Sequence, residues 1–314
     1  MIKGTYIFYE NGKEILRSSN IITKFGKRFL TNLIAGNVNF DKKDIALGIG
    51  ETSATVNDTR LEFETYRLPV IFGSTDIQTS EGVTTYSVIY KTTLPVDVSG
   101  RITEVGLYPS TRSSIINFDS KFISDFNSYL EWFDESGLHP DVDPDYARIG
   151  NDLILMQSNS GEAQEYISNV PGLDISGYGV SDTFKLAYYK YDTNLNSIEI
   201  RFYSSDTDYY YFTPTVASGT GYKLSSDIPL SELLSSGSPD KRSIVKIGVV
   251  LTPTGSTTTE VGMDGLRVND EDTFDPIFGI ISRSILLDSL GDPSPLNKIA
   301  GRQVDIEYKL DIGF

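Results

Sequence analysis

The residues of this chain that could do chemistry are one histidine, many carboxylates and many tyrosines. His139, the only histidine, lies in a proline-flanked acidic loop with no nucleophile motif around it. We therefore expect a surface histidine rather than a member of a catalytic triad or a metal ligand. The chain has no cysteine, which excludes disulfides, thiolate metal sites and a thiol nucleophile. It also lacks a glycine-rich phosphate loop followed by Lys-Ser/Thr. No catalytic residue is predicted.

Carboxylates are in excess, with 43 Asp and Glu against 27 Lys and Arg and a net charge of −16. This balance argues against a surface for nucleic acid or anionic lipid, because phosphate binding needs clustered cations. Most acidic clusters read as solvated turns, although two carboxylates could serve in glycoside cleavage. The best candidate is Asp264, which with Glu162 could bind a structural Ca²⁺ through oxygen ligands. The alternative for Asp264 is hydrogen bonding within a turn. No other cofactor is expected.

Aromatic side chains give a second kind of candidate site, one that stacks on sugar rings. In the run Tyr209-Tyr210-Tyr211-Phe212, a strand would place Tyr209 and Tyr211 on one face and the other two on the opposite face. One face must pack into the core, and the other could bind a sugar or a partner protein. Trp132, the sole tryptophan, is a similar candidate. Burial in the core is the alternative for all three residues.

The elements that must position these residues are mostly strands. Residues 5–17 predict a β-hairpin around Asn11-Gly12, and residues 24–35 predict a helix that Thr23 caps and Gly36 ends. Short strands are expected over 45–49, 60–72, 84–94 and 101–108. Residues 118–133 have aromatic residues at helical spacing but could equally be irregular strand. From residue 152 to 268 alternation predicts a jelly-roll-like sandwich that ends on a strand at 261–268.

Two more strands, over 278–287 and 303–312, cannot stand alone and need a sheet to join. The first part of the chain lacks its closing strands, so we predict one discontinuous domain, residues 1–112 with 275–314. It is expected to be a small sandwich or barrel-like domain with one helix. Residues 113–274 are expected to form an inserted jelly-roll β-sandwich, which makes the protein mainly β.

Five segments in a fixed order resemble a family of bacteriophage tail and baseplate-associated structural proteins. They are Asn20-Ile21-Ile22-Thr23 with Gly26-Lys27; Ala46 to Thr52; Asn57 to Val70; Ile102 to Leu107; and Ser282-Arg283, Pro295 to Lys298 and Asp305 to Tyr308. In simpler members the fourth segment leads almost directly to the Ser-Arg strand. The inserted part resembles carbohydrate-binding jelly rolls only generically, through residues 173–176, 182–184 and 264–267.

The resemblance implies structural roles for the scaffold residues. Gly48 and Gly106 are expected to allow close approach of strands. Arg67, Glu104 and Arg283 could form ion pairs at a sheet edge or at a subunit contact, and pairing within one subunit is the stronger expectation.

The expected function is that of a non-enzymatic component of a tailed-phage virion, in the tail, baseplate or a fibre junction. Its jelly roll would bind a host-surface glycan or decorate the particle, in several symmetric copies and with other virion proteins as partners. The N-terminus begins as a strand and lacks an apolar signal region, so assembly in the host cytoplasm without membrane insertion is expected. The alternatives are a glycan-degrading enzyme with an ancillary jelly roll, a cellular surface adhesin, and a neck or capsid-surface fibre protein.

Overall fold

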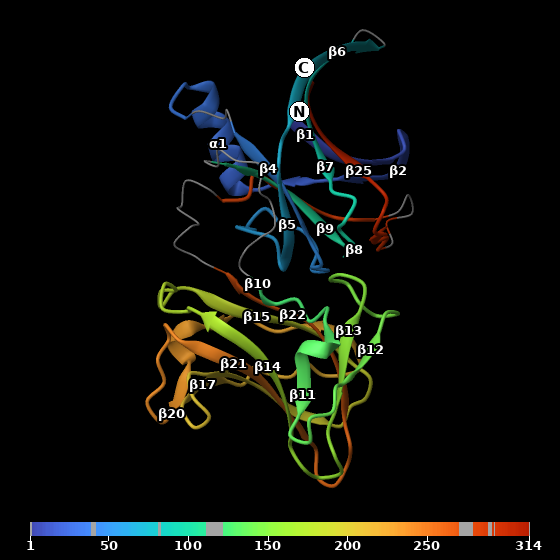
Figure 1. The fold of residues 1–314 in the computed structure, drawn as a ribbon. Coiled ribbons are helices and arrows are strands. Elements are labelled where there is room, and N and C mark those ends of the chain that lie inside the picture. The colour runs from blue at the N-terminus through green and yellow to red at the C-terminus, as the bar shows by residue number, and fades with distance from the viewer. Residues whose placement is uncertain are drawn as a thin grey trace. The chain divides into compact units, whose positions relative to one another are not determined.

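β-Strands dominate the chain, as predicted, and they form two units. The computed structural model describes residues 2–38, 42–80, 83–110, 122–269, 279–287, 291 and 293–313. The first unit comprises Met1–Ser120 with Phe274–Phe314, and the second comprises Lys121–Thr273. Figure 1 shows that both ends of the chain belong to the first unit. The boundaries expected from the sequence, at 112/113 and 274/275, lie outside the described residues.

The first unit begins with the predicted hairpin. Strand β1 (Ile2–Glu10) and strand β2 (Lys13–Ser19) pair antiparallel across the turn. Asn11 and Gly12 have φ values of 51° and 74°, the left-handed conformation that a tight hairpin turn requires at both central positions.

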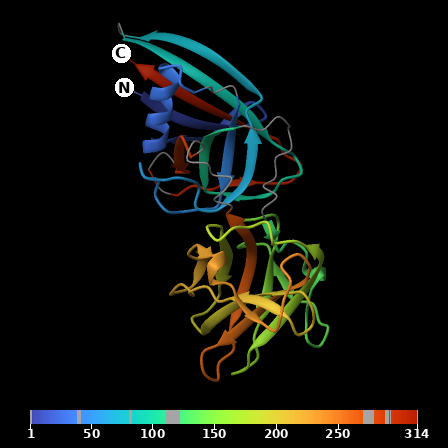
Figure 2. The same ribbon diagram turned by 90° about the vertical axis from the view of Figure 1, so that its left-hand side faces the viewer.

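The C-terminal strand completes the sheet that the N-terminus starts. Strand β25 (Val304–Gly313) pairs with β1 from Ile2 opposite Ile312 to Glu10 opposite Val304. The full strand order is β2-β1-β25-β7-β6, with β7 at Val83–Leu94 and β6 at Phe72–Ser80. The discontinuous fold predicted from the sequence is therefore confirmed, and the strands that form it can be followed in Figures 1 and 2.

A second five-stranded sheet packs against the first. Its order is β3 (Ile21–Ile22), β23 (Ser282–Ile285), β9 (Glu104–Pro109), β4 (Lys43–Gly48) and β5 (Glu64–Pro69). A short ladder joins β24 (Leu296–Lys298) to β8 (Gly100–Ile102). Tyr6, Ile306, Leu107 and Ile45 contribute to the shared core. Gly106 is needed here because a Cβ would come within 2.5 Å of Ile280 Cδ1.

Helix α1 (Lys24–Ile34) is the predicted helix, and it begins where the sequence places its cap. Thr23 Oγ1 accepts the N–H of Gly26 at 2.9 Å, and Gly36 follows the helix with a φ of 73°. The Phe29 side chain is buried in the core of the first unit. Ile34, the last residue of the helix, is 84% exposed. No helix among the described residues is long and apolar enough to cross a membrane.

The second unit is a jelly-roll-like sandwich of two sheets. The seven-stranded sheet contains β10 (Phe122–Ser124), β12 (Asp141–Asp143), β13 (Leu153–Gln157), β22 (Glu260–Asn269), β15 (Thr183–Lys190), β18 (Gly221–Leu224) and β19 (Ile228–Pro229). The six-stranded sheet runs β11 (Trp132–Asp134), β14 (Gln164–Leu173), β21 (Ile244–Pro253), β16 (Leu195–Tyr203), β17 (Tyr209–Phe212) and β20 (Leu234–Ser236). Two 3₁₀ turns cover Tyr129–Glu131 and Leu230–Glu232.

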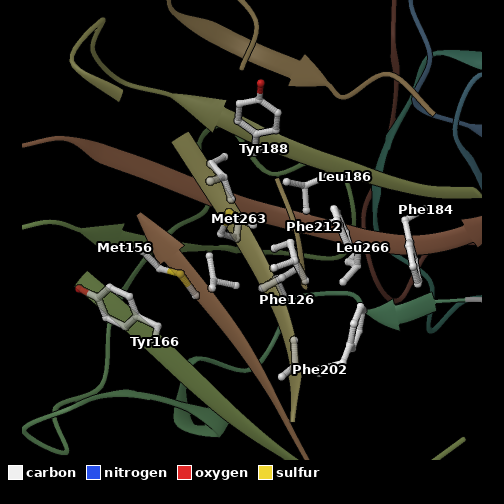
Figure 3. Close-up of a cluster of buried hydrophobic side chains, with 14 of the residues drawn as sticks. Phe126, Met156, Tyr166, Phe184, Leu186, Tyr188, Phe202, Phe212, Met263 and Leu266 are labelled. Carbon is white, nitrogen blue, oxygen red and sulfur yellow. The ribbon is translucent and has the colours of Figure 1, made fainter. Parts of the chain in front are cut away.

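Alternating residues from both sheets meet in the core of this unit. Figure 3 shows Phe184, Leu186 and Tyr188 of β15 with Met263 and Leu266 of β22, facing side chains of the other sheet such as Phe202 and Phe212. The Phe184 and Phe212 rings stack at 5.0 Å. This core belongs to the second unit alone, because every residue in it comes from 121–273.

For residues 118–133 the sequence left helix and irregular strand open, and within the described part the structure has the second alternative, with β10, a 3₁₀ turn and β11. Phe126 has a φ of 50° there, which a helix does not allow. The strand expected over 60–72 begins only at Glu64, and β6 follows it where a loop was expected.

Candidate functional site

The outer face of the six-stranded sheet carries a row of aromatic and charged side chains. On β16, Ile198, Ile200 and Phe202 point into the core, so Glu199, Arg201 and Tyr203 point outward. The pairing of β16 with β17 places Tyr209 opposite Tyr203 and Tyr211 opposite Arg201. The strand face predicted for Tyr209 and Tyr211 is the one that the structure shows, because Phe212 lies in the core and Tyr210 packs against it.

Arg201 is the centre of this face. Its Nε donates to Glu199 Oε1 at 2.6 Å, and its Nη1 donates to Glu165 Oε2 at 3.3 Å. The same Nη1 donates to the hydroxyl of Tyr203 at 3.2 Å, and the guanidinium lies 5.0 Å from the ring centroid of Tyr209. One cation therefore ties together residues of β14, β16 and β17.

A glycine on the intervening strand makes this arrangement possible. Gly248 of β21 lies between Arg201 on one side and β14 on the other. A Cβ at this position would collide with Glu165 Oε1 and lie 3.0 Å from Tyr203 Cε2. Because the glycine leaves this space, the Tyr203 hydroxyl reaches across β21 and donates to Glu165 Oε1 at 2.7 Å.

The charges on this face are fixed. Burial and the hydrogen bond to Glu165 raise the pKa of Tyr203 well above its usual range, so its hydroxyl stays protonated. Burial lowers the pKa of Arg201, but its bonds to Tyr203 and Glu199 outweigh this and raise the pKa further above its usual value. The face therefore offers a permanent set of donors and acceptors that suits binding.

The tyrosine rings form the aromatic part of the site, and neighbouring rings are tilted to one another by 47° (Tyr203 and Tyr209) and 56° (Tyr209 and Tyr211). The centroids of Tyr203 and Tyr209 are 4.9 Å apart, and those of Tyr209 and Tyr211 are 5.8 Å apart. Tyr209 and Tyr211 are half-buried, and Tyr203 is buried. On the edge strand β20, Leu234 pairs with Tyr211 and is 56% exposed. We call Glu165, Glu199, Arg201, Tyr203, Tyr209 and Tyr211 the tyrosine platform.

Trp132, the other aromatic candidate, is not on a binding surface. It lies on the inward face of β11, is 1% exposed, and stacks on Phe126 at 4.9 Å. The prediction that it could contact a sugar is wrong, because Trp132 and Phe126 of the segment before β11 pack together in the sandwich core.

Asp264 and Glu162, the pair proposed to bind Ca²⁺, lie far apart in the structure. Asp264 is fully buried in β22, where one carboxylate oxygen accepts the N–H groups of Arg148 and Ile149 and the hydroxyl of Tyr222. Glu162 is exposed in the loop that follows β13. The last residue of β13, Gln157, pairs with Glu260 of β22, so this loop starts at the Glu260 end of β22. Asp264 lies four positions further along the strand than Glu260, a distance of about 13 Å. The two carboxylates cannot share one ion, so this prediction is corrected.

The scaffold residues lie in two separate contacts of the first unit. Arg283 donates to Glu104 Oε2 from Nε at 3.0 Å, and Glu104 also accepts the backbone N–H groups of Gly50 and Phe63. Arg67 is elsewhere, bonded to Glu64 at 2.5 Å and lying 4.0 Å over the ring of Tyr108. Both contacts form within the chain: Glu104 holds residues beyond the ends of β4 and β5, and Arg67 joins side chains of β5 and β9.

Across the described ranges, from 2–38 to 293–313, no three His, Asp or Glu side chains gather closely enough to hold a metal ion. His139 is exposed, and its Nδ1 bonds the carbonyl of Trp132 at 2.7 Å.

Sequence reasoning missed four members of the platform: Glu165, Glu199, Arg201 and Tyr203. A signal was present for three of them, since Glu199-x-Arg201-x-Tyr203 alternates with the core residues Ile198, Ile200 and Phe202. Glu165 could not be found in this way, because only the pairing of β14, β21 and β16 brings it beside Arg201.

Comparisons with known proteins give likenesses of fold. No family model matches the sequence, and no curated protein matches it. A family 11 carbohydrate-binding module from Clostridium thermocellum, in complex with a β-1,3-1,4-mixed-linked tetrasaccharide, is 13% identical over 47% of this chain and 94% of its own, with a TM-score of 0.36. A family 30 module of the cellulosomal cellulase Cel9D-Cel44B from the same organism is 15% identical over 48% and 97%, with a TM-score of 0.34. An exo-β-agarase is 10% identical over 48% of this chain and 25% of its own, with a TM-score of 0.36.

Proposed function

We propose that this protein is a non-enzymatic structural component of a tailed-phage virion that displays a saccharide-binding module. The second unit binds a glycan of the host surface through the tyrosine platform. The first unit attaches the module to the tail, baseplate or a fibre junction, with other virion proteins and further copies of the chain as its partners.

The observation that carries the binding proposal is the tyrosine platform itself. Sugar rings present a C–H face that packs on aromatic rings, and Tyr209 and Tyr211 offer such rings on one strand face. Sugar hydroxyls both donate and accept, and the ion-paired Glu165, Glu199 and Arg201 supply both kinds of partner at the edge of the rings. Since these groups already hold one another, little conformational freedom is lost on binding.

The architecture supports the virion part of the proposal. The first unit is closed by strands from both ends of the chain, and the second unit is inserted into it with a separate core. This arrangement suits an anchor that carries a displayed module, and several copies would give weak sugar contacts a useful combined affinity. The ordered sequence segments similar to phage tail and baseplate proteins lie in this first unit.

Retention on polysaccharides tests the binding proposal. The panel contains mixed-linkage β-glucan, agarose, chitin, mannan and peptidoglycan, and the full chain is expected to bind at least one of them. Tyr209→Ala and Tyr211→Ala are each expected to weaken retention about fivefold, because a stacked ring contributes about 1 kcal/mol. Tyr86→Ala is the matched control, since Tyr86 is 47% exposed in the first unit. Failure to bind the whole panel, or platform variants that bind as the parent chain does, overturns the proposal.

Two further measurements test the remaining parts. Gold-labelled antibody against the protein is expected to mark the tail region of intact particles, and unlabelled particles contradict the virion assignment. Incubation with each retained polysaccharide is expected to release no reducing ends. Their release would show that the chain is an enzyme.

A further inference from the structure

The outer face of the seven-stranded sheet, on the opposite side of the sandwich from the tyrosine platform, is crossed by the segment 144–150. Ala147 and Ile149 of this segment are buried. Buried Asp264 accepts the N–H groups of Arg148 at 3.0 Å and Ile149 at 3.2 Å, and the Arg148 guanidinium lies 3.9 Å over the ring of Tyr222. The segment is therefore held to the sheet by its backbone as well as by its side chains.

This fixed segment completes a cluster of three tyrosines. Tyr146 stacks on Tyr189 of β15 with centroids 4.1 Å apart and an interplanar angle of 21°. Tyr191 meets Tyr189 edge-on at 4.7 Å, and its hydroxyl donates to Asp143 at the end of β12. Tyr189 faces outward, since its neighbour Tyr188 lies in the core. Tyr146 is 40% exposed although its ring is held in place by the other two.

We propose that Tyr146, Tyr189 and Tyr191 with Asp143 form a second saccharide-binding surface, specific for uncharged sugars. The exposed ring of Tyr146 stacks on the C–H face of one sugar residue. Asp143, which accepts from Tyr191, and its sequence neighbours Asp141 and Asp145 are the acceptors for sugar hydroxyls.

Charge selects the ligand class. Asp141 and Asp145 are exposed and flank Asp143, so this end of the face is acidic. Lys190, between Tyr189 and Tyr191 in the sequence, is buried and donates to the carbonyl of Ala217 at 2.9 Å, and the Arg148 guanidinium lies over the ring of Tyr222. Glycans that bear carboxylate or phosphate are repelled by such a surface, whereas neutral sugars are not. The two surfaces lie on opposite sides of one core, so a single module could bridge two glycan chains.

Combining variants of both surfaces in the full chain tests this second site, and the test uses mannan, β-glucan, agarose and chitin as neutral probes. Tyr146→Ala alone is expected to weaken retention on a bound matrix about fivefold. A chain with Tyr209→Ala and Tyr211→Ala is expected to keep a residual retention that disappears when Tyr146→Ala is added. Tyr129→Ala is the matched control, because Tyr129 is 41% exposed and precedes β11 of the other sheet. Emission from buried Trp132 reports whether each variant keeps its core.

The outcomes separate this proposal from the function proposed above. Platform variants that bind as the parent chain does, together with a loss in Tyr146→Ala, overturn the first site and support the second. The second site is overturned if the platform variants remove all retention, or if Tyr146→Ala matches Tyr129→Ala in both backgrounds. Retention on alginate that depends on Tyr146 overturns the uncharged ligand class.

Discussion

Asp264 shows how one buried carboxylate can organise a surface. It is fully buried on β22, yet its partners come from the segment 144–150 and from Tyr222 on β18. Through these bonds it fixes the segment that carries Tyr146. The sequence indicated Asp264 as a candidate metal ligand. In the structure its carboxyl oxygens accept hydrogen bonds from protein N–H and O–H groups.

The environment of Asp264 predicts a dependence of stability on pH. Burial raises its pKa to about 7, although the hydrogen bonds from Tyr222, Arg148 and Ile149 partly oppose this rise. In an unfolded chain the same carboxyl has a pKa of about 3.9. Between pH 4 and 7 the folded state thus holds a proton that the unfolded state has released. This contribution to the stability of the second unit falls as pH rises, by at most about 1.4 kcal/mol per pH unit.

Urea unfolding followed by Trp132 fluorescence measures this effect, because the only tryptophan lies in the core of the second unit. Asp264→Asn cannot titrate, so the stability of the parent chain relative to this variant is expected to decline from pH 5 to pH 7. Exposed Glu232→Gln is the control and should follow the parent chain. Equal pH slopes in the parent and Asp264→Asn would show that the carboxyl has no raised pKa.

At the scale of elements, local signals in the sequence predicted local structure well. The Asn11-Gly12 turn needs φ > 0 at two positions, and Thr23 offers a hydroxyl where a helix needs an acceptor. Both signals depend on a few adjacent residues. Alternation likewise identified the inward faces of β15 and β16, because a period of two fixes which side chains share a face.

Elements whose structure depends on distant partners were harder to predict. Strand β6 has the mostly polar sequence Phe72-Gly-Ser-Thr-Asp-Ile-Gln-Thr-Ser, and it is a strand because β7 pairs with it. The aromatic spacing before Trp132 left helix and irregular strand equally open, and the choice depends on Phe126 and Trp132 packing in the core of a sandwich. For the platform, Tyr209 and Tyr211 were predictable from strand alternation. Their contact with Arg201 and Glu165 required the strand order of the folded sheet.

The cap of helix α1 is also the point where the helix joins the returning C-terminal part of the chain. Thr23 Oγ1 accepts from Gly26 N–H and donates to the carbonyl of Ile280 at 2.5 Å, across 257 residues of sequence. Thr23→Ala removes both bonds from a fully buried site and is expected to lower the free energy of unfolding of the first unit by about 2 kcal/mol. Thr23→Ser keeps the hydroxyl and should lose less than half of that amount. Calorimetry on the full chain compares them, and equal losses in the two variants would contradict the role given to the hydroxyl.

At the scale of the whole molecule, the insertion point is an antiparallel pair of strands. Leu107 of β9 pairs with Ser282 of β23, and the N–H of Ile281 donates to the carbonyl of Leu107 at 2.8 Å. The chain thus leaves the first unit along one strand and returns along its neighbour. Because the two units have separate cores, a module can be inserted here without changing the sheet that receives it.

This geometry predicts that either unit folds without the other. Replacing residues 111–278 by a Gly/Ser linker of about five residues turns β9 and β23 into an ordinary hairpin. The shortened chain is expected to keep a β-type circular dichroism spectrum and a cooperative thermal transition. Residues 121–273 alone should keep the emission of a buried Trp132 and retain the full chain's binding to polysaccharide. An unfolded shortened chain would mean that the sheet formed by both ends needs the inserted module, and the anchor-and-module organisation would then be wrong.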